Sequence, residues 1–166
     1  MNKLIIIEGA DGTGKSTLAR EIQEATKGHL IHGSWKKEWD IPEYHQEMYF
    51  AALTLLEFQP VIIDRWAVSE EVYANAYRGG AKYSADEWME QHMSPERFEE
   101  AIFIYCENEN AVANHEANKQ IREELFDDVE PVVQAYEKYM ADTAIKWHRY
   151  DFNKVDMKEF VKEILT

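Results

Sequence analysis

The sequence has very little cysteine and few basic residues. Cys106 is the single cysteine among 166 residues, which excludes an intramolecular disulfide framework and a cysteine-based zinc site and fits a reducing compartment. Lysine and arginine number 18 against 32 aspartate and glutamate, so the formal net charge is −14. A field of that sign repels phosphate backbones and anionic membrane surfaces. We therefore expect no binding to nucleic acid or membranes, and a small, locally positive pocket for any phosphorylated ligand.

Long apolar runs and linkers are also absent. No stretch approaches the roughly 20 apolar residues of a membrane span, and the chain opens directly into a strand pattern, with no signal peptide in view. No repeat, low-complexity tract or Gly/Ser-rich linker divides the sequence. Hydrophobic residues make up 45% of the chain, which is enough for a core. We expect one domain over 1–166, in a soluble cytoplasmic protein.

Short apolar segments alternate with longer amphipathic ones, a pattern typical of an α/β fold. Three continuous apolar runs predict strands buried on both faces of a parallel sheet: 4–7, 61–63 and 102–105. Two weaker segments predict strands nearer the edges: 29–32 and 147–150. Amphipathic segments predict helices at about 15–27, 43–58, 68–78, 84–92, 121–142 and 155–165. Pro131 falls inside the fifth of these, which predicts a kink.

One segment after the third buried strand is polar and has almost no large apolar residue. It covers residues 107–119. Such composition is typical of a mobile loop, and its place after a central strand is where a lid would be attached. We place the lid at about 107–121, with Lys119 and Arg122 as its candidate cations.

A phosphate-binding loop follows the first strand. The stretch GADGTGKS (9–16) satisfies G-x-x-x-x-G-K-[ST] between a buried strand and a helix start. Backbone N–H groups of such a loop cradle phosphates at a helix N-terminus. We expect Lys15 to reach the β- and γ-phosphates of ATP and Ser16 to ligate Mg²⁺. The predicted phosphate-binding residues are Gly9, Ala10, Asp11, Gly12, Thr13, Gly14, Lys15, Ser16 and Thr17.

A second motif, Asp64 followed by Arg65, indicates which reaction the phosphate-binding loop serves. Asp64 ends the strand 61–63, which places a carboxylate at the carboxyl end of a strand beside the loop, where ligands bind in open parallel sheets. Asp64 is therefore a candidate for the metal or the attacking oxygen. Arg65 follows, and an arginine there can hold a second phosphate bidentately. The structural alternative is a surface ion pair at a strand end. We predict Lys15, Asp64 and Arg65 as catalytic, and Ser16 with Asp64 as metal ligands.

Together, the segments IEGADGTGKST (7–17) and DRWAVSEEVY (64–73) resemble the thymidylate kinase family. They are most similar to its compact, phage-type deoxynucleoside monophosphate kinases, whose D-R-aromatic-x-x-S-x-x-x-Y motif is matched at every fixed position. The resemblance implies a three-layer P-loop NTPase-type fold, with a five-stranded parallel sheet, helices on both faces and a short lid. It also implies small-molecule nucleotides as partners, Mg²⁺ with ATP as donor, and a possible homodimer. The implied reaction gives ADP and dNDP from ATP and a deoxynucleoside 5′-monophosphate, dTMP or another.

The resemblance also assigns roles to residues. Arg65 would grip the 5′-phosphate of the acceptor, Asp64 would act near magnesium, and Tyr73 would disfavour a ribose 2′-hydroxyl. The implied or candidate acceptor-binding residues are Asp11, Arg65, Ser69, Glu70, Tyr73, Arg78 and Phe50. Several have structural alternatives: Tyr73 as core, Arg78 as part of a helix cap with its glycines, and Phe50 as part of an apolar helix face.

The chain departs from the family in its arginines. Relatives bring extra arginines to the transferring group from the P-loop or the lid, but here the P-loop position is Gly12 and the lid carries only His115 and Lys119 before Arg122. The positive charge that phosphoryl transfer requires is then expected from Lys15, Mg²⁺ and Arg65, with Lys119 and Arg122 as further candidates. A carboxylate at Glu70 would favour a base that presents N–H groups, so the acceptor base stays open.

Two other functions compete with this reading. A deoxynucleoside kinase shares the fold but needs a general base near the 5′-hydroxyl, and the region after the second strand has no carboxylate before Glu38. A GTPase-type switch would carry N-K-x-D, whereas residues 118–121 read NKQI and lack the aspartate. The six histidines have no metal-ligand spacing, so none is predicted as a ligand.

Overall fold

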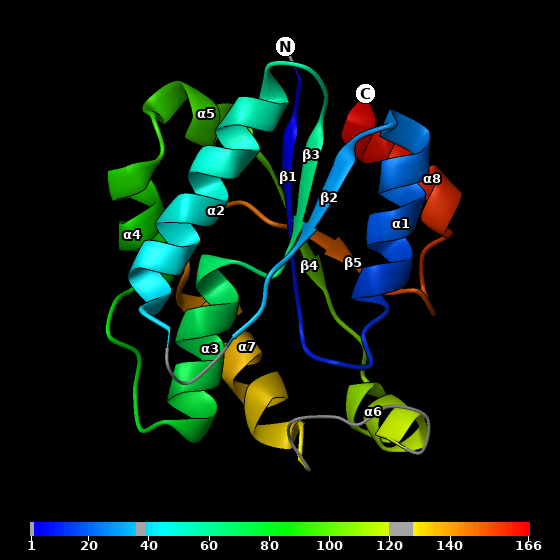
Figure 1. The fold of residues 1–166 in the computed structure, drawn as a ribbon. Coiled ribbons are helices and arrows are strands. Elements are labelled where there is room, and N and C mark those ends of the chain that lie inside the picture. The colour runs from blue at the N-terminus through cyan, green and yellow to red at the C-terminus, as the bar shows by residue number, and fades with distance from the viewer. Residues whose placement is uncertain (1, 36–38, 120–127) are drawn as a thin grey trace.

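The computed structural model describes residues 2–35, 39–119 and 128–166. Within these ranges the chain forms a five-stranded, all-parallel sheet in the order β2-β3-β1-β4-β5 (Figure 1). The strands are β1 (Leu4–Glu8), β2 (His29–His32), β3 (Val61–Asp64), β4 (Ile102–Cys106) and β5 (His148–Tyr150). All five predicted strands are confirmed. β1, β3 and β4, the continuous apolar runs, are buried along their whole length and occupy the centre of the sheet.

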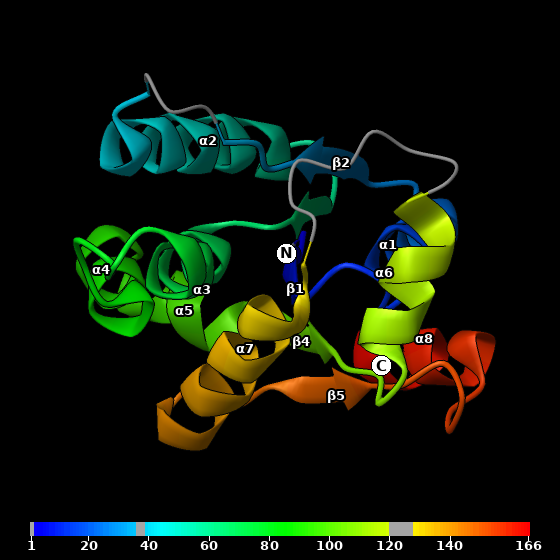
Figure 2. The same cartoon turned by 90° about the horizontal axis from the view of Figure 1, so that it is seen from below.

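Helices cover both faces of the sheet (Figure 2). Ile5 and Ile7 of β1 pack with α1 (Lys15–Thr26) and α8 (Met157–Leu165) on one face. Ile6 faces the other side, where α2 (Ile41–Leu56), α3 (Ala67–Tyr77), α4 (Ala85–His92) and α7 (Glu130–Asp142) form the larger core. Alternate residues of each central strand thus serve opposite faces, as the pleat requires. The predicted α/β three-layer architecture is confirmed.

Two features of the helices correct the sequence-based expectations. Pro131 lies in the first turn of α7, because that helix begins at Glu130. At that position its missing N–H costs no internal hydrogen bond, so the predicted kink is wrong. Residues 121–127 of the predicted helix lie outside the described residues. The structure also has a helix that was not predicted, α5 (Pro95–Glu100), where Ser94 accepts a hydrogen bond from the Arg97 N–H as N-cap.

The polar segment predicted to belong to a lid contains the helix α6 (Ala111–Lys119). Ala111 and His115 are buried, each with 1% of its surface exposed, although the rest of the segment has little apolar surface. The sequence-based expectations had no helix in this segment, and α6 corrects them; the lid itself stays a prediction. Lys119 ends α6, and Arg122 lies outside the described residues.

The described helices include none that is both long enough and apolar enough to cross a membrane.

Candidate functional site

The P-loop connects β1 to α1. Lys15 opens the helix and is buried, and its ammonium donates a hydrogen bond to the Ala10 carbonyl oxygen at 3.2 Å, so it lies across the loop. Burial and the nearby Arg65 charge lower the pKa of Lys15. Ser16 and Thr17 follow on the exposed first turn of α1. The backbone at Gly9, Gly12 and Gly14 has positive φ, as the predicted phosphate loop requires.

Helix α6 packs directly on this loop. The Asn114 amide donates a hydrogen bond to the Gly12 carbonyl oxygen at 3.0 Å. Gly12 has φ of 80°, and a Cβ built on it would collide with the Ala111 carbonyl oxygen. The segment expected to be a lid thus supports the outer side of the P-loop, and the close packing excludes any side chain at Gly12.

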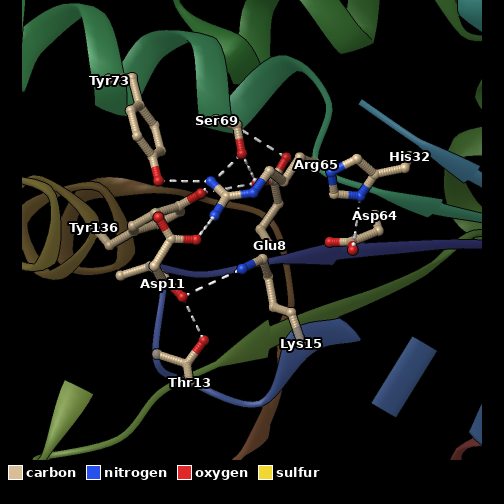
Figure 3. A network of polar contacts seen from close by, with 11 residues as sticks. Glu8, Asp11, Thr13, Lys15, His32, Asp64, Arg65, Ser69, Tyr73 and Tyr136 are labelled. Atoms are coloured by element: carbon tan, nitrogen blue, oxygen red, sulfur yellow. Dashed lines mark hydrogen bonds and ion pairs between the residues drawn. The ribbon is translucent and has the colours of Figure 1, made fainter. Parts of the chain in front are cut away.

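Asp64 lies at the carboxyl end of β3, beside the P-loop strand. It is 2% exposed, and its Oδ2 lies 3.0 Å from His32 Nδ1 (Figure 3). Its other carboxylate oxygen, Oδ1, is buried and has no hydrogen-bond partner among the residues that the structure describes. Burial acts to raise the pKa of Asp64, but the His32 hydrogen bond and the charges of Lys15 and Arg65 outweigh it and lower the pKa. Asp64 is therefore an ionised carboxylate with a free acceptor.

Arg65 comes directly after β3, and its backbone adopts the left-handed conformation, with φ of 71°. Its guanidinium donates to the Tyr73 hydroxyl at 2.7 Å and forms an ion pair with Asp11 of the P-loop (Figure 3). Burial raises the pKa of Tyr73 to about 12, so the phenol stays protonated. This backbone conformation costs free energy in a residue other than glycine, and residues with such strain are commonly found at functional sites. The two segments of the family resemblance therefore meet in space.

Glu8, at the end of β1, is one of the residues of this region that were not predicted from the sequence. It is fully buried and accepts hydrogen bonds from the Trp66 N–H at 2.8 Å, the Ser69 N–H at 3.3 Å, the Ser69 hydroxyl at 2.5 Å and the Tyr136 hydroxyl at 2.9 Å. These bonds fix the start of α3 to the sheet and so set where Arg65 leaves β3. The available signal was a carboxylate inside an otherwise apolar, buried run.

A cavity of about 450 Å³ opens beside these residues. Six of the seven predicted acceptor-binding residues line it: Asp11, Arg65, Ser69, Glu70, Tyr73 and Arg78. Phe50 does not line it. Its side chain is on α2 and 56% exposed, while the neighbouring Tyr49 is buried against Trp66. The cavity wall also includes Trp35 and His45, which were not predicted as acceptor-binding residues.

Arg78 is the C-cap residue of α3, where its N–H donates to the Ala74 carbonyl oxygen at 2.9 Å, and its side chain also lines the cavity. Its guanidinium donates to Glu70 Oε2 at 2.8 Å and lies 5.0 Å from the centre of the Trp35 ring. Glu70 is 8% exposed, so this ion pair is partly shielded from water. Because a carboxylate accepts hydrogen bonds and a guanidinium donates them, the pair offers both functions to a ligand side by side.

The residues present fit a magnesium ion with its nucleotide. No group of three or more His, Cys, Asp or Glu side chains is placed to hold a metal within 2–35, 39–119 and 128–166. Mg²⁺ in phosphoryl-transfer sites, however, keeps several waters and uses one or two protein ligands with substrate phosphates. Asp64 supplies a buried carboxylate oxygen without a hydrogen-bond partner in the described part of the chain, and Ser16 supplies an exposed hydroxyl on the first turn of α1.

Comparison with known proteins gives the fold. No family model and no curated protein matches the chain. The YorR protein of Bacillus subtilis, solved in complex with phosphorylated GDP, matches with a TM-score of 0.67 at 20% identity, over 98% of this chain and 94% of that one. Deoxyadenosine kinase from M. mycoides, solved with dCMP and dCDP, matches with a TM-score of 0.58 at 16% identity, over 98% and 96%. Thymidylate kinase from Ehrlichia chaffeensis gives 0.57 at 15% identity, over 99% and 97%.

The chain shares its fold with these nucleotide-binding proteins. The match extends along nearly the whole of each, so the predicted P-loop kinase fold is confirmed.

Proposed function

We propose that this protein is an ATP-dependent nucleotide kinase that transfers the γ-phosphoryl group of ATP to a deoxynucleoside 5′-monophosphate, dTMP or another, giving ADP and the diphosphate. The observation that carries the proposal is the position of Arg65. Its guanidinium lies in the wall of the cavity of about 450 Å³, next to the P-loop residue Asp11. A permanent cation at that place is suited to the phosphate of an acceptor beside the donor phosphates.

The P-loop would hold the donor. Backbone N–H groups of 9–14 and the helix N-terminus at Lys15 favour the phosphates of ATP, and the Lys15 ammonium offsets charge that develops on the transferred group. Ser16 and Asp64 would hold Mg²⁺, which neutralises charge on the donor phosphates when bound. Residues Gly9 to Thr17 and Asp64 are proposed in these roles, and Lys119 and Arg122 remain candidates for additional positive charge.

The cavity would hold the acceptor, with its phosphate at Arg65. Tyr73 receives a hydrogen bond from Arg65 and lines the same wall, a position suited to packing on the sugar. The Glu70–Arg78 pair, with Trp35 beside it, offers an acceptor, donors and an aromatic face, which suits a base edge that presents both an N–H group and a carbonyl or ring nitrogen. Ser69 is already engaged by Glu8, so we propose an indirect role for it.

A deoxynucleoside kinase is the second candidate. One observation favours it: Asp64 and His32 form a carboxylate–imidazole pair beside the cavity, and His32 lines the cavity wall, so a proton acceptor lies near where a 5′-hydroxyl could be placed. The shared fold does not separate the two, because both a nucleoside kinase and a nucleotide kinase match at nearly equal TM-scores.

A coupled ADP-release assay with ATP and Mg²⁺ tests the proposal. The acceptor panel is dTMP, dGMP, dCMP, dAMP and dUMP, beside thymidine, deoxycytidine and the ribonucleotide UMP. Turnover with one or more deoxynucleoside monophosphates and little with UMP supports the proposal and the role of Tyr73. Turnover with bare nucleosides alone would establish the second candidate. No turnover with any acceptor, while ATP still binds, would overturn both.

A further inference from the structure

The pairing of β2 with β3 brings the imidazole of His32 into contact with the carboxylate of Asp64. His32 ends β2 and is the register partner of Asp64, which ends β3. The two side chains meet at 3.0 Å between His32 Nδ1 and Asp64 Oδ2. Because an ionised carboxylate only accepts, the hydrogen must be on Nδ1, which leaves Nε2 of the neutral ring as an acceptor.

The register that makes this contact is fixed by the next residue. The Gly33 N–H donates to the Asp64 carbonyl oxygen at 2.8 Å, and a Cβ built on Gly33 would collide with the Arg65 carbonyl oxygen. A glycine is therefore required for β2 to approach β3 this closely. Gly33 follows His32, and Arg65, which has a positive φ, follows Asp64. The close backbone contact between Gly33 and Arg65 therefore fixes the relative position of the His32–Asp64 pair.

The two carboxylate oxygens of Asp64 differ in their hydrogen bonding. Oδ2 is occupied by His32, whereas Oδ1 is buried and without a hydrogen-bond partner among the described residues. An unpaired, buried carboxylate oxygen costs free energy unless a ligand or an ion meets it. The asymmetry is difficult to explain for a surface ion pair, because the Asp64 side chain is 3% exposed and the His32 side chain 59%.

We propose that His32 is a positioning residue: by donating Nδ1–H to Oδ2, it holds the Asp64 carboxylate so that Oδ1 is available to Mg²⁺ bound with ATP. The inference rests on the proposed function for its metal, but its central test needs no acceptor and no turnover. Hydrogen bonds to metal-ligating groups orient them, and their loss typically weakens metal binding about 10- to 100-fold. A competing role, in which Nε2 contacts the acceptor phosphate, makes opposite predictions.

Asparagine and glutamine variants separate the two nitrogens of His32. The amide nitrogen of asparagine is bonded to Cγ, as Nδ1 of histidine is, whereas that of glutamine is one atom further out, nearer to the place of Nε2. The variants are His32→Ala, His32→Asn and His32→Gln. The control is His29→Asn at the other end of β2, where the histidine is also exposed.

The first readout is Mn²⁺ affinity in the presence of ATP and without acceptor, measured by electron paramagnetic resonance. We expect His32→Ala to weaken Mn²⁺ binding about 10-fold or more, His32→Asn to restore it to within about 3-fold, and His32→Gln to restore little. The control should bind as the wild type does. Thermal unfolding should move by no more than a few degrees in every variant, because His32 is exposed.

The second readout is the Mg²⁺ concentration for half-maximal turnover, compared with the KM of the acceptor. A raised Mg²⁺ requirement with unchanged acceptor KM supports the proposal. Mn²⁺ binding of His32→Ala equal to the wild type would overturn it, and so would rescue by glutamine but not by asparagine, which assigns the role to Nε2. If the wild type turns over no acceptor at all, the proposed function fails, while the Mn²⁺ titration still decides the role of His32.

Discussion

Two buried carboxylates end adjacent strands of the sheet, Glu8 on β1 and Asp64 on β3, and their surroundings are opposite. Glu8 is fully buried and accepts four hydrogen bonds, from the backbone and side chains at the start of α3 and from α7. Asp64 is almost equally buried but accepts one, and its Oδ1 has none among the described residues. Burial raises the pKa of Glu8, whereas the pKa of Asp64 is lowered despite its burial.

This difference distinguishes a structural carboxylate from one available for chemistry. Saturated hydrogen bonds make Glu8 part of the scaffold that holds α3 and Arg65 in place. An incomplete set, with cations nearby, leaves Asp64 ionised and free to bind a ligand. The comparison therefore predicts that substitutions at the two sites will separate stability from activity.

The largest effect is expected for Asp64→Asn. It keeps the shape but removes the charge and one acceptor, and we expect kcat to fall on the order of 10³-fold, as for the loss of an electrostatic contact to the transition state. The midpoint of thermal unfolding should fall only modestly, because the loss of the interactions with His32, Lys15 and Arg65 is partly offset by removing the cost of burying the charge. Steady-state kinetics and differential scanning calorimetry measure the two effects. Near-normal turnover would place the reactive carboxylate elsewhere.

Arg65→Ala should weaken acceptor use. Hydrogen bonds to a charged group contribute roughly 1.5–3 kcal/mol, so kcat/KM for the acceptor should fall roughly 10- to 150-fold, with the KM for ATP nearly unchanged. Arg20→Ala, on the exposed side of α1, is the matched control. If the KM for ATP rises and acceptor use is normal, Arg65 belongs to the donor site instead.

Glu8→Gln should mainly destabilise the fold. With the amide nitrogen of glutamine in place of Oε2, the Ser69 and Tyr136 hydroxyls lose the acceptor that they share and must donate elsewhere, at a cost of roughly 1–3 kcal/mol in the free energy of unfolding. Urea unfolding measures it, with Glu24→Gln on exposed α1 as control. Activity per folded molecule should fall far less than in Asp64→Asn. An equal loss of activity would mean that Glu8 takes part in the chemistry.

The smallest effect is a dependence on pH. Because burial raises the pKa of Glu8 above its usual 4.5, the folded state binds more protons there, so its contribution to stability is lost as the pH rises. Burial lowers the pKa of His45 to about 4, which acts in the opposite direction below pH 6.5 but is common to both proteins. The stability of the wild type relative to Glu8→Gln should therefore decline from about pH 4.5 upward. A difference that grows with pH would show that hydrogen bonds to the ionised Glu8 outweigh burial.

Local signals in the sequence were enough to predict the P-loop, the five strands and Asp64 at a strand end. The P-loop and the strands are each encoded within a few consecutive residues. The place of Asp64 follows because the carboxyl ends of parallel strands lie at one edge of the sheet. The phosphate, catalytic and metal assignments on 9–17, Asp64 and Arg65 remain predictions for experiment.

Contacts between distant residues were not available from the sequence. Tyr136 reaches Glu8 across 128 positions, and His32 reaches Asp64 across 32. No periodicity encodes such pairs, since they depend on strand order and register. Helix α6 was missed for another reason: Ala111 and His115, four residues apart, form its buried seam, and neither is a large apolar residue. Phe50 was selected for its aromatic ring, but helix α2 turns it outward.

The packing of α6 on Gly12 sets the order in which this site could change. The resemblance to the thymidylate kinase family implies a P-loop arginine at the position of Gly12, but any side chain there would strike the Ala111 carbonyl oxygen, and the backbone is in the left-handed region. A lineage with this chain as its starting point could acquire that arginine only after the start of α6 had moved away. The same displacement would break the hydrogen bond from Asn114 to the loop. The fold therefore makes the gain of one catalytic cation conditional on the earlier remodelling of a helix a hundred residues away.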